Sequence, residues 1–270
     1  MEFNMRRVAQ RLASLLALFG FDATKFVGSV RGLWPYFRNR ATFKRQMAAA
    51  QATAGHFAMG RSYPSLSDRY DEAGTAQGHY FHQDLYVAQL IFRNKPHRHV
   101  DVGSRVDGFV AHVASFRKIE VLDIRPLQGA VENILFHCRD ITEERTDLDG
   151  YTDSLSCLHA LEHFGLGRYG DAVDYDGYQK GWDNLYRMLT TGGKFYFSTP
   201  IGPQRIEFDA HRVFSVSTLV KMMHGKYRID GFAYVDDAGS LVRDANPTGE
   251  EAQESFGCDY GCGIFELTKL

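Results

Sequence analysis

His99-Val100-Asp101-Val102-Gly103-Ser104-Arg105 decides the fold, together with the stretch Ile119-Glu120-Val121-Leu122-Asp123 that follows it. Both stretches begin as apolar strands, and a helix-forming segment lies between them. A strand, a glycine turn, a helix and a second strand ending in an acid is how an open α/β sheet builds a nucleoside pocket. The sequence therefore predicts that the backbone at Gly103 approaches a ligand whose ribose hydroxyls bind Asp123.

Arg105 stands where a dinucleotide-binding loop has its second glycine. The loop therefore lacks the pyrophosphate cradle of that fingerprint. The predicted ligand carries a ribose rather than a diphosphate.

Length and composition indicate an ordinary globular protein, since the 270 residues are 44% hydrophobic and 24% charged. The four cysteines are too scattered for a disulfide framework, which favours a reducing compartment and a cytoplasmic location. Cys258 and Cys262 have the spacing of half a zinc site, but no second pair accompanies them, and we predict no bound metal.

Charge is distributed unevenly along the chain. Residues 1–45 hold nine Lys or Arg against two acids, a net charge of +7 that leaves −9 for the remainder. The apolar run Leu12–Phe21 is too short to span a bilayer, and no clear signal-peptide cleavage site follows it. Residues 1–45 are predicted to rest on an anionic surface of the inner membrane or on a partner protein. The alternative is a helix packed on its own domain.

Three parts are expected along the chain: a basic helical region at 1–60, a turn-rich connector at 61–78 and an α/β domain at 79–270. In the α/β domain, helical and strand patterns alternate, which predicts a mostly parallel sheet with helices on both faces. Breaks in the first region are expected at Gly20, Gly28, Gly32 and Pro35. Helices are expected at 82–94, 107–116, 174–190 and 215–224, and strands at 98–103, 119–124, 133–138, 152–157 and 193–199. Segments 227–236 and 261–269 are expected to form an antiparallel pair at the sheet edge.

Polar residues recur where the predicted strands end. Because the carboxyl ends of parallel strands meet at one edge of a sheet, these residues should converge on one site. Asp123 is assigned to a ribose, Asp140 to an adenine amino group, and Ile141 or Leu158 to the face of the base. Each Asp taken alone could equally be a helix cap or a turn residue.

This layout resembles the class I S-adenosylmethionine-dependent methyltransferases. The resemblance implies a Rossmann-like sheet, S-adenosylmethionine as cofactor, and a possible pairing of Arg105 with the methionine carboxylate. The matching strings are Val100–Ser104, Val121–Asp123, Cys138–Ile141, Leu161–His163, Leu185–Leu189 and Gly192–Pro200. The cofactor-binding residues implied are Tyr80, His82, Asp101, Gly103, Ser104, Arg105, Asp123, Ile124, Arg125, Asp140, Ile141 and Leu158.

A second resemblance is to a branch described as domain of unknown function 268. Members of that branch are similar to methyltransferases encoded among surface-polysaccharide genes, which implies a sugar or glycan acceptor. The strings that carry this resemblance are Gly78–Asp84, Asp101–Arg105, Asp123–Pro126, Glu162–Asp171 and His211–Phe214.

The histidines supply candidates for a general base. His159 and His163 frame an H-x-x-E-H string, but the glycines of Phe164–Gly167 break the long helix that a zinc protease needs. Just beyond a strand end, either histidine could instead accept a hydroxyl proton; it could also be a non-titrating part of the wall. His211 is the other candidate base by resemblance, and Asp209, His211 and Glu162 offer an alternative divalent-ion site.

Contacts with the acceptor are expected from Glu162, Arg168, Tyr169 and Arg212. Arg168 and Tyr169 lie in the glycine-rich segment Gly165–Asp171, which is expected to be a mobile loop or, alternatively, a tight turn. Cationic and aromatic side chains of this kind suit a sugar or a phosphorylated sugar.

The function predicted from these residues is S-adenosylmethionine-dependent O-methylation of a sugar or polysaccharide intermediate. The alternative is a methyltransferase-like scaffold in a glycan-assembly complex that has lost the cofactor. A nucleotide-sugar enzyme is disfavoured because the phosphate loop is absent. Nucleic acid is not expected as a partner, because the catalytic part is acidic.

Overall fold

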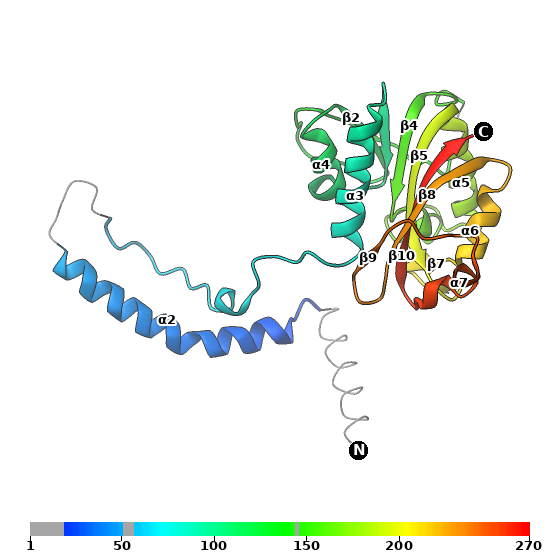
Figure 1. The fold of residues 1–270 in the computed structure, drawn as a ribbon. Helices are drawn as coiled ribbons and strands as arrows, with labels where there is room; N and C mark the ends of the chain where they lie inside the picture. The colour runs from blue at the N-terminus through cyan, green and yellow to red at the C-terminus, as the bar shows by residue number, and fades with distance from the viewer. Residues whose placement is uncertain (1–18, 51–56, 144–145) are drawn as a thin grey trace, which may run out of the picture. The chain divides into compact units, whose positions relative to one another are not determined.

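The computed structural model describes residues 19–50, 57–143 and 146–270. The chain divides into two compact units after Thr75. The second unit, drawn from cyan-green to red in Figure 1, is built on one large sheet. Its strands are β1 (His99–Val102), β2 (Ile119–Asp123), β3 (Ile134–Cys138), β4 (Thr152–Leu158), β5 (Leu189–Ile201), β8 (Tyr227–Val235), β9 (Leu241–Val242) and β10 (Gly261–Lys269).

The strands lie in the order β3-β2-β1-β4-β5-β10-β8-β9. Neighbours from β3 to β5 pair in parallel, whereas β10 pairs antiparallel with both β5 and β8. The expected Rossmann-like sheet, mostly parallel with antiparallel C-terminal strands, is therefore confirmed. Strand order reverses between β1 and β4, and ligands of open α/β sheets bind at such a switch point.

Helices cover both faces of this sheet, which explains why its central strands are apolar on both sides. In β5, Phe195 and Phe197 pack in one core cluster and Tyr196 in the other. The first cluster lies beneath α5 (Gly177–Met188) and α6 (Val216–Met223). The second lies beneath α3 (His79–Asn94) and α4 (Ala111–Ala114), as Figure 1 shows.

Three local features differ from the sequence prediction. The helix expected at 107–116 begins as a π-helical turn at Val106–Val110 before α4. The strand expected at 193–199 begins earlier, so that Gly192 and Gly193 lie inside β5, where the pairing with β4 jumps from Leu189 to Lys194. A small second sheet, not predicted, pairs β6 (Arg205–Glu207) with β7 (His211–Val213). Short helices η1 (Asp68–Tyr70), η3 (Leu161–His163), α7 (Glu250–Gln253) and η4 (Ser255–Gly257) complete the fold.

The first unit contains one long helix, α2 (Ala23–Ala49), which starts at an Asp22 cap. The breaks expected at Gly28, Gly32 and Pro35 are wrong, because the helix continues through all three.

The returning segment 59–70 explains why these residues are tolerated within the helix. A Cβ on Gly32 would lie 1.9 Å from the Leu66 carbonyl oxygen, so only glycine allows this contact. Pro35 has no N–H to donate to the Arg31 carbonyl, and the Tyr70 hydroxyl donates to that carbonyl instead, at 3.3 Å.

The apolar run Leu12–Phe21 falls mostly outside the described residues. In the part that the structure describes, no helix combines the length and the apolar character needed to cross a membrane.

Candidate active site

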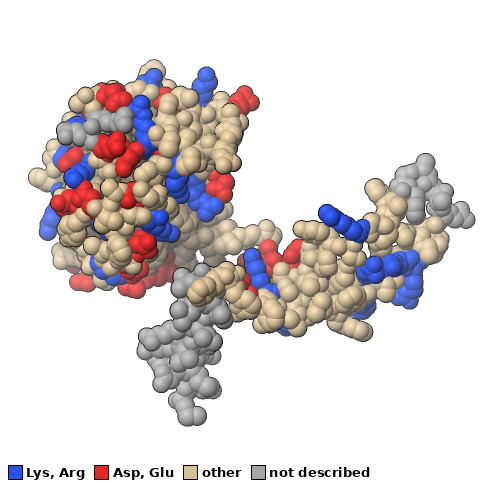
Figure 2. Space-filling model, turned by 180° about the vertical axis from the view of Figure 1, so that it is seen from behind, with Lys and Arg blue, Asp and Glu red and all other residues tan. Residues whose placement is uncertain are grey.

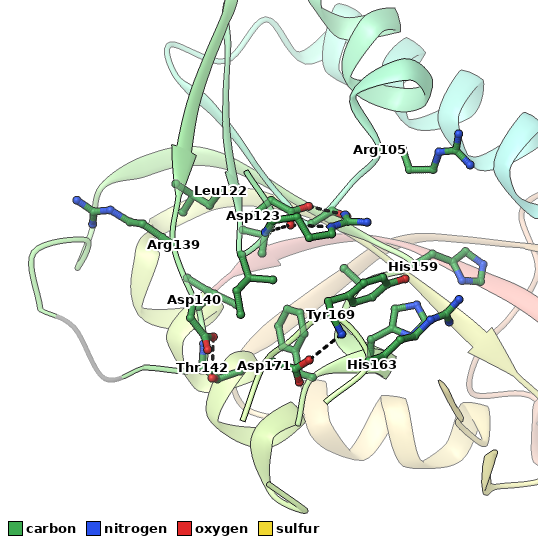
Figure 3. Close-up of a pocket in the computed structure, with 18 of the residues that line it drawn as sticks. Arg105, Leu122, Asp123, Arg139, Asp140, Thr142, His159, His163, Tyr169 and Asp171 are labelled. Atoms are coloured by element: carbon green, nitrogen blue, oxygen red, sulfur yellow. Dashed lines mark hydrogen bonds and ion pairs between the residues drawn. The ribbon is translucent and has the colours of Figure 1, made fainter. Parts of the chain in front are cut away.

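A cavity of about 330 Å³ opens at the switch point between β1 and β4. Its volume is within the range of small-molecule sites, about 300–1,000 Å³. Figure 3 shows the side chains that surround it. The structure brings together thirteen of the predicted site residues in its wall: Tyr80, Gly103, Arg105, Asp123, Ile124, Arg125, Asp140, Ile141, Leu158, His159, His163, Arg168 and Tyr169.

Gly103 forms the turn after β1 and has a φ of 79°, a conformation that favours glycine. Its N–H donates to the Leu122 carbonyl, and a Cβ at this position would lie 2.7 Å from the Ala160 Cβ. The Gly103 backbone after β1 therefore packs against the Ala160 side chain after β4. Because Gly103 has no side chain, it contributes only backbone atoms to the cavity wall.

Asp123 ends β2 with its carboxylate beside the cavity. Its Oδ1 accepts from the Arg125 backbone N–H at 2.8 Å and from the Arg125 Nε at 2.9 Å, and Oδ2 accepts from Nη2 at 2.5 Å. The Arg125 guanidinium also lies 4.6 Å from the centre of the Tyr169 ring. A carboxylate offers about four lone-pair positions, so a second ligand must share Asp123 with Arg125 or displace its guanidinium toward Tyr169.

Asp140 follows β3 and is shaped by an Asx-type turn. Its Oδ1 accepts from the Thr142 N–H at 2.8 Å and from the Thr142 hydroxyl at 2.7 Å. Between Asp123 and Asp140, the wall is apolar: Leu122, Ile141 and Leu158 all line the cavity. A cavity lined by these apolar side chains and by two carboxylates suits a base joined to a ribose.

Asp101, Ser104 and His82 do not line the cavity, contrary to their predicted contact with a cofactor. Asp101 is fully buried, and its carboxylate accepts from the Ser104 N–H, the Ser104 hydroxyl and the Ser156 hydroxyl. Burial raises the pKa of Asp101 to about 7, against the opposing effect of these hydrogen bonds. Asp101 and Ser104 therefore hold the glycine turn in place from behind.

The Arg105 guanidinium is paired with a neighbouring acid, Asp107, rather than directed into the cavity. Its guanidinium donates to both carboxylate oxygens of Asp107, at 3.0 and 2.7 Å, and the side chain is 67% exposed. Figure 3 shows it at the margin of the group, away from Asp123 and Asp140. Arg105 thus borders the cavity without filling it.

A buried carboxylate connects the two histidines after β4. The His159 Nδ1–H donates to Glu162 Oε1 at 2.7 Å, and His163 Nε2 lies 3.8 Å from the same oxygen. The Nδ1–H of His163 donates to the Ala210 carbonyl at 2.7 Å. Glu162 is fully buried and does not line the cavity, so its predicted contact with an acceptor is wrong; it orients the histidines instead.

The two histidines differ in their preference for a proton. Burial lowers the pKa of His159, but the neighbouring Cys262 and Glu162 raise it well above its ordinary value. Burial lowers the pKa of His163, and Glu162 offsets this only in part. His163 is therefore neutral at pH 7, with Nδ1 protonated and the Nε2 lone pair available.

His159 also has a strained backbone. Its φ of 50° lies in the left-handed region, which costs a non-glycine residue about 1–3 kcal/mol. The His159 N–H donates to the Ser198 carbonyl of β5, which fixes this conformation. The His79 and Tyr80 rings each lie 5.2 Å from the His159 ring, so the imidazole is held on several sides.

Within the described residues, one group of three potential metal ligands occurs, formed by His79, His159 and Cys262. The His79 and His159 rings are stacked with an interplanar angle of 16°. Their in-plane lone pairs therefore lie in two nearly parallel planes and cannot both point at one ion, as a tetrahedral site requires. The alternative set of Asp209, His211 and Glu162 does not form such a group among these residues.

The segment Gly165–Asp171 is a tight turn, which was the alternative to a mobile loop. The Asp171 carboxylate accepts from the backbone N–H groups of Gly165, Gly167 and Tyr169, at 2.9 to 3.2 Å. The Arg168 guanidinium donates to the Ala210 carbonyl at 2.8 Å. Tyr169 contacts the His163 ring edge-on at 5.4 Å. The segment thus forms the cavity wall opposite Asp123.

Two further predictions for this region need correction. His211 does not line the cavity; its Nε2 lies 3.0 Å from the Glu207 carboxylate, and its ring packs on Tyr260. Arg212 is 5% exposed, and its guanidinium donates to the carbonyls of Glu162, Phe164 and Tyr175. Arg212 therefore stabilises the chain after β4, and it does not line the cavity in which it was expected to contact an acceptor.

Several residues that line the cavity were missed by the sequence analysis. Leu122 and Val102 precede Asp123 and Gly103 in their strands, and their positions as the last apolar residues of β2 and β1 could have identified them. The others follow strand ends, where the direction of a side chain depends on the turn. The missed residues are Val102, Leu122, Arg139, Thr142, Ala160, Phe164 and Asp171.

Strand order, a cavity at the switch point and an acid at a strand end together define a Rossmann-like α/β fold. Solved structures with similar folds include the N-methyltransferase NodS from Bradyrhizobium japonicum WM9 in complex with S-adenosyl-l-homocysteine. It is 13% identical, with 85% of this chain and 97% of that chain covered and a TM-score of 0.46. The [4+2]-cyclase SpnF is 12% identical, with 91% and 96% covered and a TM-score of 0.49. A 1,6-didemethyltoxoflavin-N1-methyltransferase from Burkholderia thailandensis is 13% identical, with 69% and 78% covered and a TM-score of 0.47.

Residues 117–249 match the family described as "Caenorhabditis protein of unknown function, DUF268". The expected resemblance to this family is thus confirmed over just under half of the chain. The strings Gly78–Asp84 and Asp101–Arg105 lie before the matched segment. No curated protein matches this chain in sequence.

Proposed function

We propose that this chain is an S-adenosylmethionine-dependent methyltransferase that acts on a hydroxyl of a sugar or glycan intermediate. The observation that carries the proposal is the Asp123 carboxylate, which lies beside a cavity at the switch point together with the bare backbone of Gly103. These two groups are the ones that a nucleoside requires of an open α/β sheet.

The remaining wall fits such a cofactor. Asp123 would hold the ribose, Asp140 would accept from the adenine amino group, and Leu122, Ile141 and Leu158 would enclose the base. The Tyr80 ring, which also lines the cavity, offers a π-face, which favours a positively charged sulfonium. The cofactor, when bound, supplies a methyl group carried on that sulfonium.

His163 is the residue best placed to act as general base. Its neutral imidazole has Nδ1–H fixed on the Ala210 carbonyl, so that Nε2 is the atom that accepts the hydroxyl proton. Glu162 lies 3.8 Å from Nε2 and stabilises the imidazolium that results. His159 is less suited to this role, because Glu162 and Cys262 keep its proton in place.

The acceptor class rests on the side chains across the cavity from Asp123. Arg168 and Tyr169 present a cation and an aromatic ring on a rigid turn. An aromatic ring packs against the C–H face of a sugar, and a guanidinium binds hydroxyl or phosphate oxygens. The resemblance of the sequence to methyltransferases of polysaccharide loci supports the same acceptor.

Calorimetric titration of the full chain with S-adenosylmethionine and S-adenosylhomocysteine tests the cofactor. Both should bind, and Asp123→Asn should weaken binding by about 10- to 100-fold, the usual effect of losing a charged hydrogen bond. Asp183→Asn is the matched control, since Asp183 lies on α5 and pairs with Lys226 outside the cavity. Absence of heat with both compounds would favour the inactive scaffold.

Transfer of a labelled methyl group tests the acceptor separately. The acceptor panel should contain free hexoses, sugar 1-phosphates and nucleotide sugars, with a small amine and an RNA as comparisons. Label should enter a sugar with one equivalent of S-adenosylhomocysteine released. Label entering the amine or the RNA alone would contradict the sugar assignment and leave the cofactor assignment intact.

A further inference from the structure

Helix α2 carries an unpartnered apolar face within its own unit. At about 100° per residue, six large apolar side chains fall within an arc of about 120°. They are Phe26, Val27, Val30, Leu33, Trp34 and Phe37, and each is 42–74% exposed. The arc extends over three turns of the helix, and Trp34, the most exposed of the six, lies within it.

The opposite side of α2 is the side on which the chain packs back. Gly28 faces Ser67, and Gly32 faces the Leu66 carbonyl. On the helical wheel, Gly28 and Gly32 lie about 140° or more from the centre of the apolar arc. In the part of this unit that the structure describes, the returning segment 59–70 therefore covers the glycine side and leaves the apolar arc uncovered.

Charge on α2 has one sign only. The helix contains six Lys or Arg residues and no acid. On the wheel, Arg31 and Arg38 flank one edge of the apolar arc, and Arg40 flanks the other. Figure 2 shows blue side chains distributed along this unit among mostly uncharged neighbours.

We propose that α2 lies on an anionic membrane surface, with the apolar arc in the boundary between headgroups and acyl chains. An apolar arc with aromatic residues and cations along both edges is the pattern of a helix that lies in this plane. Long basic side chains at the edges reach the phosphates while their stems stay against the acyl region. A second copy of α2 would bring like charges together, which disfavours self-association through this face.

The proposal does not depend on the proposed function, since none of the residues that line the cavity belongs to α2. The proposal also places no helix across the bilayer, because α2 would lie parallel to the membrane surface.

Sedimentation of the full chain with vesicles tests the proposal. The protein should sediment with vesicles of phosphatidylcholine mixed with phosphatidylglycerol, far less with phosphatidylcholine alone, and less as salt rises. The tryptophans provide a second readout. Trp182 is 3% exposed and should not respond, so a blue shift of the emission on adding vesicles reports Trp34.

Two pairs of substitutions separate the apolar and the charge contributions. Trp34→Ser with Phe37→Ser should abolish sedimentation at all salt concentrations. Arg31→Gln with Arg38→Gln should lower partitioning into anionic vesicles about 20- to 30-fold, since each cation near such a surface contributes about fivefold. Lys221→Gln with Arg243→Gln in the α/β unit is the control for net charge and should leave binding unchanged.

Other occupants of the face would give different results. Failure to bind anionic vesicles at low salt would overturn the proposal. So would a dimer in analytical ultracentrifugation that Trp34→Ser with Phe37→Ser dissociates, because the face would then belong to a second copy. Protection of residues 26–37 from hydrogen exchange in a vesicle-free monomer would assign the face to the chain's own α/β unit.

Discussion

Glu162 gives two neighbouring histidines opposite roles. Glu162 accepts a hydrogen bond from His159 at 2.7 Å, whereas His163 Nε2 lies farther from the same oxygen, at 3.8 Å. An ionised Glu162 is expected, because His159 and His163 lower its pKa despite the opposing effect of burial. One buried carboxylate thus produces a fixed imidazolium and a neutral imidazole four residues apart.

His163 should control the acid side of the pH profile. Because its pKa is lowered from the ordinary 6.5, methyl transfer should persist as the pH falls to 6.5 and decline only below that. His163→Gln should reduce kcat by about 100- to 10,000-fold, the usual contribution of a general base, with little change in affinity for S-adenosylhomocysteine. His211→Gln serves as the comparison; a larger loss there than at position 163 would transfer the role of base to His211.

Asp101 should make the protein less stable as the pH rises. With a folded pKa of about 7 against 3.8 in the unfolded chain, it holds a proton in the folded state across that window. Its contribution to the unfolding free energy is therefore complete below pH 4 and lost as the pH rises through 7. Between pH 4 and pH 8, the unfolding free energy of Asp101→Asn should rise relative to that of the natural protein by on the order of 2–4 kcal/mol.

Urea unfolding at a series of pH values measures this difference. Asparagine can keep the hydrogen bonds, with its oxygen toward the Ser104 N–H and its amide toward the two hydroxyls that now donate to Asp101. A difference between the two proteins that stays constant with pH would show that Asp101 is ionised throughout.

At the scale of elements, the contact between the turns after β1 and β4 constrains the cavity. Gly103→Ala should lower both stability and affinity for S-adenosylhomocysteine, because of its positive φ and the contact with Ala160. Gly129→Ala isolates the first effect, since Gly129 has a φ of 87° and no atom within 4 Å of a built Cβ. The backbone effect alone is about 1–2 kcal/mol.

The companion change Ala160→Gly tests the steric part. In the double variant, the clash at 2.7 Å disappears while the backbone strain remains. Thermal unfolding and calorimetry should therefore show partial recovery relative to Gly103→Ala alone. Equal behaviour of the single and double variants would mean that the two turns do not constrain each other.

Strand ends were predictable from sequence, and the turns beyond them were not. Gly103, Asp123 and Asp140 lie at the cavity because the carboxyl ends of parallel strands share one edge, a property of the fold itself. Arg105 and Arg212 point elsewhere because local partners, Asp107 and a set of carbonyls, compete for their guanidinium groups. Such competition depends on how turns fold back, for which one sequence gives no periodic signal.

The sheet was predictable for a related reason. Central strands such as β5 are apolar on both faces, and the helices between them have a period that differs from that of strands. Strand order could not be derived in this way, and neither could the short pair β6 and β7, whose three-residue strands have too little pattern to detect.

At the scale of the whole molecule, the cavity belongs to one unit. Every residue that lines it lies between Tyr80 and Asp171, and the chain divides after Thr75. A chain beginning at Ala76 should therefore bind S-adenosylhomocysteine with a Kd within about threefold of that of the full chain, as expected of a domain with its own core. Calorimetry measures this directly. A loss of tenfold or more would mean that residues 1–75 contribute to the site.

The hydrogen bond from the Tyr70 hydroxyl to the Arg31 carbonyl determines the shortest amino-terminal fragment that should keep α2 intact by itself. Attached to an unrelated carrier, residues 1–60 would end before that hydroxyl and before Leu66, the residue against which Gly32 rests. In such a fusion, the helix would be destabilised at Pro35, where a backbone hydrogen bond is missing. A fusion that extends to Thr75 would keep both stabilising residues, Leu66 and Tyr70.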